Sequence, residues 1–172
     1  MLDQIESIPS PLRPFNPIIQ ALAHEGVEIS NNLCQWHQDY LERSLPETAY
    51  TRLAQIDLHA LILFLCHTYS YYECWGSLTI PSLTRSCVED HVKAIIGLAE
   101  SIQTASHVPG VLLLFALRVA GGHATNTMLM QMVIQRLDVV YWEGFIVSER
   151  IKSDLQEFWE YRRSLDGSQI YC

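Results

Sequence analysis

The longest apolar stretch of the chain runs from residue 108 to residue 124 and contains one full charge, Arg118, in seventeen residues. Burial of a Leu or Phe side chain stabilises a fold by about 1.5–3 kcal/mol. We therefore expect the apolar side chains of this stretch to form much of the core, with 111–120 as the most buried helix. Arg118 and Gly121-Gly122 interrupt the stretch, so it falls short of the roughly eighteen apolar residues of a membrane span.

Elsewhere the apolar residues recur every three or four positions, which is the spacing of amphipathic helices. A helix is expected to begin at Asn16-Pro17, because an Asn cap followed by proline is a typical helix start. It continues to about Ser44 as one long or two short helices, with a break near Gly26 or 30–32. Further helices are predicted over 51–72, from about 82 or 84 to 102, over 128–141 and over 148–163. No stretch alternates as strands do, so the predicted class is all-α, a single domain of about six to seven helices.

The chain is long enough, at 172 residues, for one domain that buries roughly 70% of its unfolded surface. Residues 1–14 hold three prolines and are predicted to form an extended lead-in. The helical domain is predicted over 15–165 and a C-terminal tail over 166–172. The five cysteines form no C-x-x-C pair, and the N-terminus lacks the basic start and apolar run of a secretory signal. These features predict an intracellular protein, in the nucleus or the cytoplasm, with free thiols.

Charge and composition narrow the range of partners. The formal net charge of -8, from 19 acidic and 11 basic residues, disfavours a direct contact with nucleic acid. Apolar residues make up 49% and charged residues 17%, which predicts an apolar surface that holds a protein partner or forms a homodimer. We predict that this apolar surface lies on the C-terminal helix. Ile151, Leu155 and either Phe158 or Trp159 would face the core, so the other aromatic residue and Tyr161 would point outward.

An aromatic cluster near the end of the central helix is the best candidate for a ligand pocket. Tyr and Trp offer an apolar body and one polar tip, which suits a flat organic effector or substrate. Such a cluster is equally typical of a core that closes where a helix meets a loop. The predicted ligand-binding residues are His67, Tyr69, Tyr72, Trp75 and His123.

No catalytic or metal motif stands out along the chain. The seven histidines include no H-E-x-x-H, and the eight-residue separation of His59 and His67 is too long for one ion. No nucleophile lies in a G-x-S-x-G turn, and Gly121-Gly122-His123 follows a helix, outside any phosphate-loop context. The sequence therefore predicts no metal and no cofactor, and it assigns no catalytic residue.

Five short motifs follow one another along the chain. They are a W…LP element within 33–46, an L-H-rich helix over 57–69, an amphipathic helix over 87–102, LFALRVAGGHA over 114–124, and a final helix over 155–163 after a Gly144 turn. Together, over about 29–165, they resemble the regulatory region downstream of the zinc-cluster module in fungal transcription factors. The segment 114–124 is similar to the L-F-x-L-x-x-A-G-x-x-A element of that family.

The resemblance implies a helical regulatory module that dimerises, binds a small organic effector or contacts other regulators. This module has no DNA-binding part of its own. The six-cysteine cluster of the family is absent, so neither its zinc nor its sequence-specific DNA recognition is carried over. Ser70-Tyr71-Tyr72 also stands where the family has Arg-Pro. An alternative class is a cofactor-free cyclase or isomerase of secondary metabolism, with a Tyr/His-lined pocket in the same helical shell. A closed cavity holding two polar groups would favour the enzyme, and an open apolar groove or two-fold interface would favour the regulator.

Overall fold

The computed structural model describes residues 8–43 and 46–168. Over these residues the chain forms six α-helices and two short 3-10 helices, with no strand, and 80% of it is helical. The prediction of an all-α fold with six to seven helices is confirmed. Three parts of the predicted segments lie outside the described residues. They are residues 1–7 of the lead-in, Ser44-Leu45 of the W…LP element and residues 169–172 of the tail.

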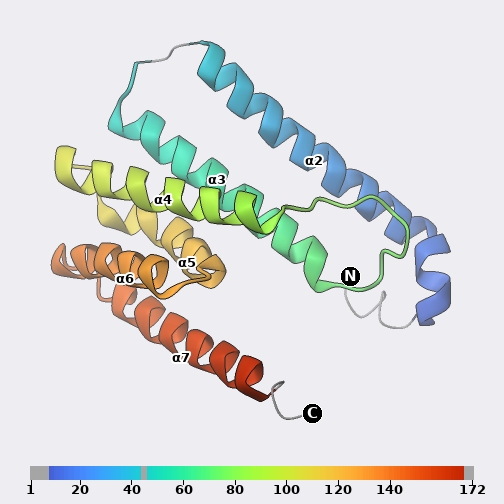
Figure 1. The fold of residues 1–172 in the computed structure, drawn as a ribbon. Coiled ribbons are helices and arrows are strands. Elements are labelled where there is room, and N and C mark those ends of the chain that lie inside the picture. Colours follow the sequence, from blue (N-terminus) through green and yellow to red (C-terminus); the bar gives the residue numbers. More distant parts are fainter. Residues whose placement is uncertain (1–7, 44–45, 169–172) are drawn as a thin grey trace. The chain divides into compact units, whose positions relative to one another are not determined.

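The helices follow one another along the chain as drawn in Figure 1. The first four are η1 (Ser10–Phe15), α2 (Pro17–Glu42), α3 (Ala49–Tyr71) and α4 (Arg85–Ala105). The last four are η2 (Gly110–Leu113), α5 (Leu114–His123), α6 (Thr127–Trp142) and α7 (Val147–Ser168).

Helix α2 begins where the sequence predicts. The Asn16 side chain accepts a hydrogen bond from the backbone N–H of Ile18 at 2.9 Å, and Pro17 occupies the first turn. The helix then runs without a break through Gly26 and residues 30–32, so of the two alternatives the structure has one long helix. Gly26 is instead a packing position, because a Cβ there would overlap the ring of Tyr69.

Other boundaries differ from the prediction. Residues 10–15 form the 3-10 helix η1, so part of the expected extended lead-in is helical. Helix α7 extends to Ser168, past the predicted end near residue 163 and through Gly167. Glycine costs only about 1 kcal/mol relative to alanine in a helix, which is too little to end a helix by itself.

The described chain divides into two compact units, with the boundary inside α3 between Ala60 and Leu61. Unit 1 comprises residues 8–43 and 61–85, and unit 2 comprises residues 46–60 and 86–168. In unit 1, residues of α2 pack against the loop that follows α3. The buried residues of this cluster are Ile19, Ala23, Cys74 and Trp75, and the half-buried Ile8, Leu22, Tyr69, Tyr72, Leu78 and Ile80 pack on it.

Unit 2 is organised around α5, which contacts both α6 and α7, while α6 and α7 also contact each other (Figure 1). Fully buried side chains here are Leu113 of η2, Ala116, Leu117 and Ala120 of α5, and Val133 and Val140 of α6. Residues 111–120 were predicted to be the most buried helix, but residues 111–113 lie in η2 and α5 begins at Leu114. This segment is buried on one side only, since Val111, Leu112 and Phe115 are exposed. A helix presents all its sides, and the packing against α6 and α7 covers only part of them.

Residues His59 and His91 join the first part of α3 to α4 within unit 2. Their Nδ1 atoms are 2.8 Å apart, so one ring donates a hydrogen bond and the other accepts it. Nearby, the Arg52 guanidinium donates to the hydroxyl oxygen of Ser101 at 2.7 Å. Among the described residues, no group of three His, Cys, Asp or Glu side chains is arranged to hold a metal ion.

Among the described residues, helix α3 is long and apolar enough to cross a membrane by length and composition. The core helix of a soluble protein passes the same test. The stretch that falls short of a membrane span by its sequence is 108–124, which lies outside α3. The absence of a membrane segment therefore stays a prediction.

Candidate functional site

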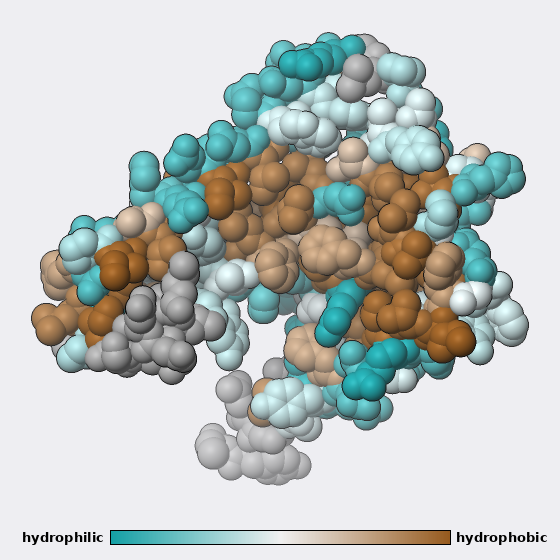
Figure 2. Space-filling view, turned by 180° about the vertical axis from the view of Figure 1, so that it is seen from behind, coloured by the Kyte–Doolittle hydropathy of each residue, from teal (hydrophilic) through white to brown (hydrophobic). Residues whose placement is uncertain are grey.

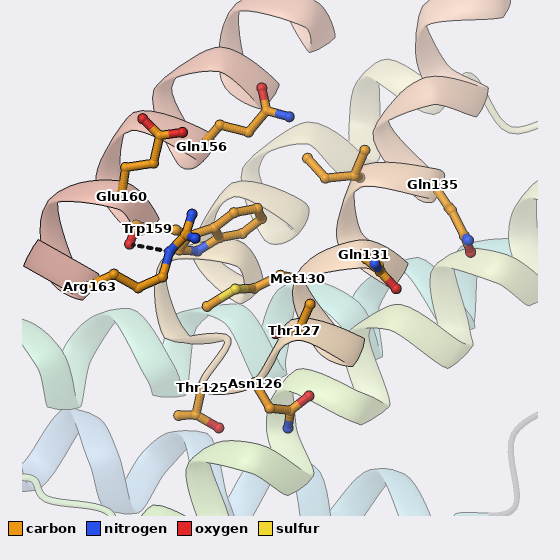
Figure 3. Close-up of a pocket in the computed structure, with 11 residues that line it drawn as sticks. Thr125, Asn126, Thr127, Met130, Gln131, Gln135, Gln156, Trp159, Glu160 and Arg163 are labelled. Carbon is orange, nitrogen blue, oxygen red and sulfur yellow. Dashed lines mark hydrogen bonds between the residues drawn. The ribbon is translucent and has the colours of Figure 1, made fainter.

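A groove with a volume of about 940 Å³ lies between the N-terminal half of α6 and the C-terminal half of α7, within unit 2 (Figure 3). Both helices and the short segment before α6 line it. The lining residues are Thr125, Asn126, Thr127, Met130, Gln131, Ile134, Gln135, Gln156, Trp159, Glu160 and Arg163.

Local contacts hold the two helices that form the groove. The Asn126 side chain caps α6 by accepting a hydrogen bond from the backbone N–H of Leu129 at 2.9 Å. Gly144, with a φ of 98°, permits the tight turn from α6 into α7. Beyond this turn the Lys152 ammonium donates to Asp138 of α6 at 3.0 Å and pairs with Glu149 at 2.8 Å. The carboxylates of Glu149 and Asp138, which accept these hydrogen bonds, raise the pKa of Lys152.

The floor of the groove is apolar. Trp159 is buried, and its indole N–H donates to the carbonyl oxygen of Gly121 on α5 at 2.9 Å. The half-buried Met130 and Ile134 complete the floor from α6. A Cβ at Gly121 would crowd the side chain of Leu155, so glycine at this position allows α5 and α7 to approach closely. The indole therefore has a fixed position at the base of the groove.

The rims of the groove are polar and carry no net charge. On α6 the rim consists of Thr127, Gln131 and Gln135, spaced four residues apart along one side of the helix. On α7 it consists of Gln156, Glu160 and Arg163. Figure 3 shows α7 with Gln156, Glu160 and Arg163 on one side and α6 on the other, with Gln135 directed away from α7. The Arg163 guanidinium donates to the Trp159 carbonyl oxygen at 3.4 Å.

This arrangement suits binding better than catalysis. The lining residues include no Ser, Cys or His, and the one carboxylate, Glu160, is exposed. General acid or base catalysis needs a titratable group held against the reacting atoms, usually with water excluded. An apolar floor between polar rims instead provides a place where a ligand buries apolar groups and forms hydrogen bonds at its edges.

The structure places three predicted ligand-binding residues, Tyr69, Tyr72 and Trp75, together in the apolar cluster of unit 1. The Tyr69 hydroxyl donates to the Leu22 carbonyl oxygen at 2.7 Å, and the Trp75 indole N–H donates to the Tyr69 carbonyl oxygen at 2.7 Å. The two rings stack with centroids 4.9 Å apart. Burial, followed by the nearby charge of Glu25, raises the pKa of Tyr69. Because the polar tips of Tyr69 and Trp75 bond within the fold, the placement of these two side chains favours a closed core over a ligand pocket.

The two predicted histidines lie elsewhere. His67 is an exposed residue of α3 in unit 1. His123 ends α5 in unit 2, where its Nδ1 atom lies 2.8 Å from the carbonyl oxygen of Val119. Neither histidine belongs to the apolar cluster that contains the three aromatic residues.

Sequence reasoning missed the groove. None of Met130, Gln131 and Gln135 is among the ligand-binding residues predicted from the sequence. The four-residue spacing of Thr127, Gln131 and Gln135 signals a polar stripe on α6. That stripe becomes one rim of a groove only because α7 returns beside it, which local spacing does not reveal.

The chain was compared with protein-family models, curated proteins and solved structures. No family model, curated protein or solved structure matches it.

Proposed function

We propose that the chain is a helical regulatory module, similar to the regulatory region of fungal zinc-cluster transcription factors, that acts through a protein partner or a small organic effector. The open α6–α7 groove carries this proposal. Its apolar floor and polar rims without net charge favour recognition, whereas a cyclase or isomerase needs an enclosed site. The net charge of -8 favours action through other molecules over direct contact with DNA. The proposal includes a location inside the cell, in the nucleus or the cytoplasm, as the free thiols predicted from the sequence suggest.

Tethering tests this function with the full chain. The chain is fused to an unrelated sequence-specific DNA-binding domain, and transcription of a reporter is measured. We expect transcription to change several-fold relative to the DNA-binding domain alone. Met130→Arg, which places a charge on the groove floor, should remove the change. The matched Met128→Arg, at a residue 71% exposed on the same helix, should preserve it.

Two results would contradict the proposed function. One is a reporter that responds equally to the DNA-binding domain with and without the chain. The other is an equal response to both methionine variants when circular dichroism shows that both are folded, because the groove would then play no part.

The outer side of α7 supports a second contact. Ile151, Leu155 and Trp159 are buried, as predicted, and Phe158 is the aromatic residue left outside. Phe158, Tyr161 and Leu165 are 40%, 62% and 49% exposed. Their spacing of three and four residues places them on one side of the helix. Figure 2 shows many apolar side chains on the face that it draws.

We expect this side of α7 to hold a second copy of the chain or a protein partner. The mass measured by light scattering should rise with concentration for the wild type and rise less for Tyr161→Ser, since the lost ring is a typical interface anchor. Tyr50→Ser, at a residue 73% exposed on α3, is the control and should behave as the wild type. A wild type that is monomeric at every concentration would rule out self-association.

A further inference from the structure

We propose that His59 and His91 form a proton-sensitive clamp, which holds the first part of α3 against α4 near neutral pH and releases it as the pH falls. Both residues lie in unit 2 and are half-buried, and neither lines the α6–α7 groove. The clamp is independent of the proposed function, because it depends on protons and not on a partner or an effector.

The number of protons on the two rings decides whether they attract or repel each other. Their Nδ1 atoms are 2.8 Å apart and their ring centroids are 5.0 Å apart, so these two nitrogens face each other. A neutral imidazole offers one N–H and one acceptor nitrogen, whereas a charged imidazole carries a proton on both nitrogens. The contact is therefore a hydrogen bond as long as one ring is neutral. When both rings are charged, two N–H groups and two positive charges oppose each other.

Charged residues on α3 and α4 lie around the helices from the two rings. None of the residues three or four positions from either histidine is charged, and the one titratable group among them is the thiol of Cys87. The charged residues within two positions are Asp57, Glu89, Asp90 and Lys93. A helix turns by about 100° per residue, so these four side chains are rotated from the histidines by about 100–200°.

Several of these charged groups have partners in the fold. Glu89 accepts a hydrogen bond from the Thr125 hydroxyl at 2.9 Å. Lys93 forms an ion pair with Asp90 at 4.0 Å. A carboxylate that already has a partner gains less from a second charge on the clamp.

The other helices of unit 2 also bring their charged groups to partners. Arg136 of α6 forms an ion pair with Glu100, near the C-terminal end of α4, at 3.5 Å. On α5, Arg118 lies 3.8 Å from Asp154 of α7. His123, at the end of α5, bonds through its Nδ1 atom within its own helix. These ion pairs are formed whatever the protonation of the clamp.

The release acts at one end of the contact between α3 and α4. His59 immediately precedes Ala60, which is the last residue of unit 2 along α3 before the boundary with unit 1. Nearer the start of α3, Arg52 donates to the hydroxyl oxygen of Ser101 at 2.7 Å. A guanidinium keeps its charge throughout this pH range. A falling pH therefore loosens the end next to the boundary and leaves the start of α3 in place.

Unfolding of the full chain at several pH values tests the clamp. Wild type and His59→Asn are unfolded in urea at pH values from about 7.5 to about 5.5, which span the usual titration of histidine. Far-UV circular dichroism gives the unfolding constant. The amide oxygen of the variant accepts the His91 Nδ1–H whether or not His91 is charged. The unfolded wild type takes up a second proton that the folded clamp resists, so its unfolding constant should rise relative to that of the variant by up to about tenfold per pH unit.

His24→Asn, at an exposed histidine of α2, is the matched control, because it makes the same substitution in a helix outside the clamp. It should keep the pH dependence of the wild type. Imidazole NMR of the wild type needs no variant: above about pH 5.5, His59 and His91 should together take up one proton, half of what two free histidines bind. The proposal is overturned if wild type and His59→Asn show the same pH dependence, or if both rings become charged over the pH range of free histidine.

Discussion

Leu114→Asp is expected to abolish the cooperative thermal unfolding transition of the helices packed around α5. Leu114 is 8% exposed at the start of this helix, between the buried Leu113 and Ala116. The substitution removes a buried side chain, at a cost of about 2–5 kcal/mol, and introduces a carboxylate whose unpaired burial costs several more. Because a whole domain is stable by only about 5–15 kcal/mol, the folded state should no longer dominate. Far-UV circular dichroism during heating measures the transition.

Leu112→Asp is the matched control for this experiment. Leu112 lies two residues earlier and is 46% exposed, so the new carboxylate stays in water. We expect its melting curve to stay close to that of the wild type. Similar melting curves for Leu114→Asp and the wild type would show that α5 does not form the core of unit 2.

Sequence reasoning succeeded where the decisive interaction is local. Helical spacing is a property of a few neighbouring residues, so it predicted the all-α class and most helices. The cap at Asn16 was predicted for the same reason, since its partner is the N–H of Ile18 two residues away. The alternation of buried and exposed residues on α7 also followed from spacing, and it placed Tyr161 outside.

The groove depends on contacts between distant parts of the chain. Trp159 takes its position from a hydrogen bond to Gly121, thirty-eight residues earlier. Similarly, the polar tip of Tyr69 bonds to Leu22, forty-seven residues earlier, which no local pattern indicates. An aromatic cluster in a sequence looks the same whether its polar atoms meet a ligand or a carbonyl oxygen of the fold. Sequence reasoning therefore left both interpretations open at Tyr69 and did not identify the α6–α7 groove.

Gly26 shows how a long-range contact changes the meaning of a residue, and it gives the second large expected effect. Glycine inside a helix ordinarily weakens it, so a change to alanine stabilises by about 0.5–1 kcal/mol. At Gly26 an added Cβ would overlap the Tyr69 ring. That ring cannot swing aside freely, because its hydroxyl bonds to Leu22 and its face stacks on Trp75.

We therefore expect Gly26→Ala to destabilise the protein. Overpacking costs about 1–3 kcal/mol, which exceeds the gain in helix propensity. Each kcal/mol lowers the melting temperature of a chain of this size by about 2–4 °C. Gly97→Ala is the matched control, since a Cβ at this position of α4 meets nothing within 4 Å. It should raise the melting temperature, so the two glycine variants shift it in opposite directions.

A double-mutant cycle identifies the cause of the loss at Gly26. Tyr69→Phe removes the hydroxyl that bonds to Leu22, so the ring gains freedom to move away from an added methyl group. Gly26→Ala should then cost less in the Tyr69→Phe background than in the wild type, because residues in contact have coupled effects on stability. Equal costs in the two backgrounds would show that the Tyr69 hydroxyl does not hold the ring against α2. A rise in melting temperature for Gly26→Ala alone would contradict the close contact between α2 and Tyr69.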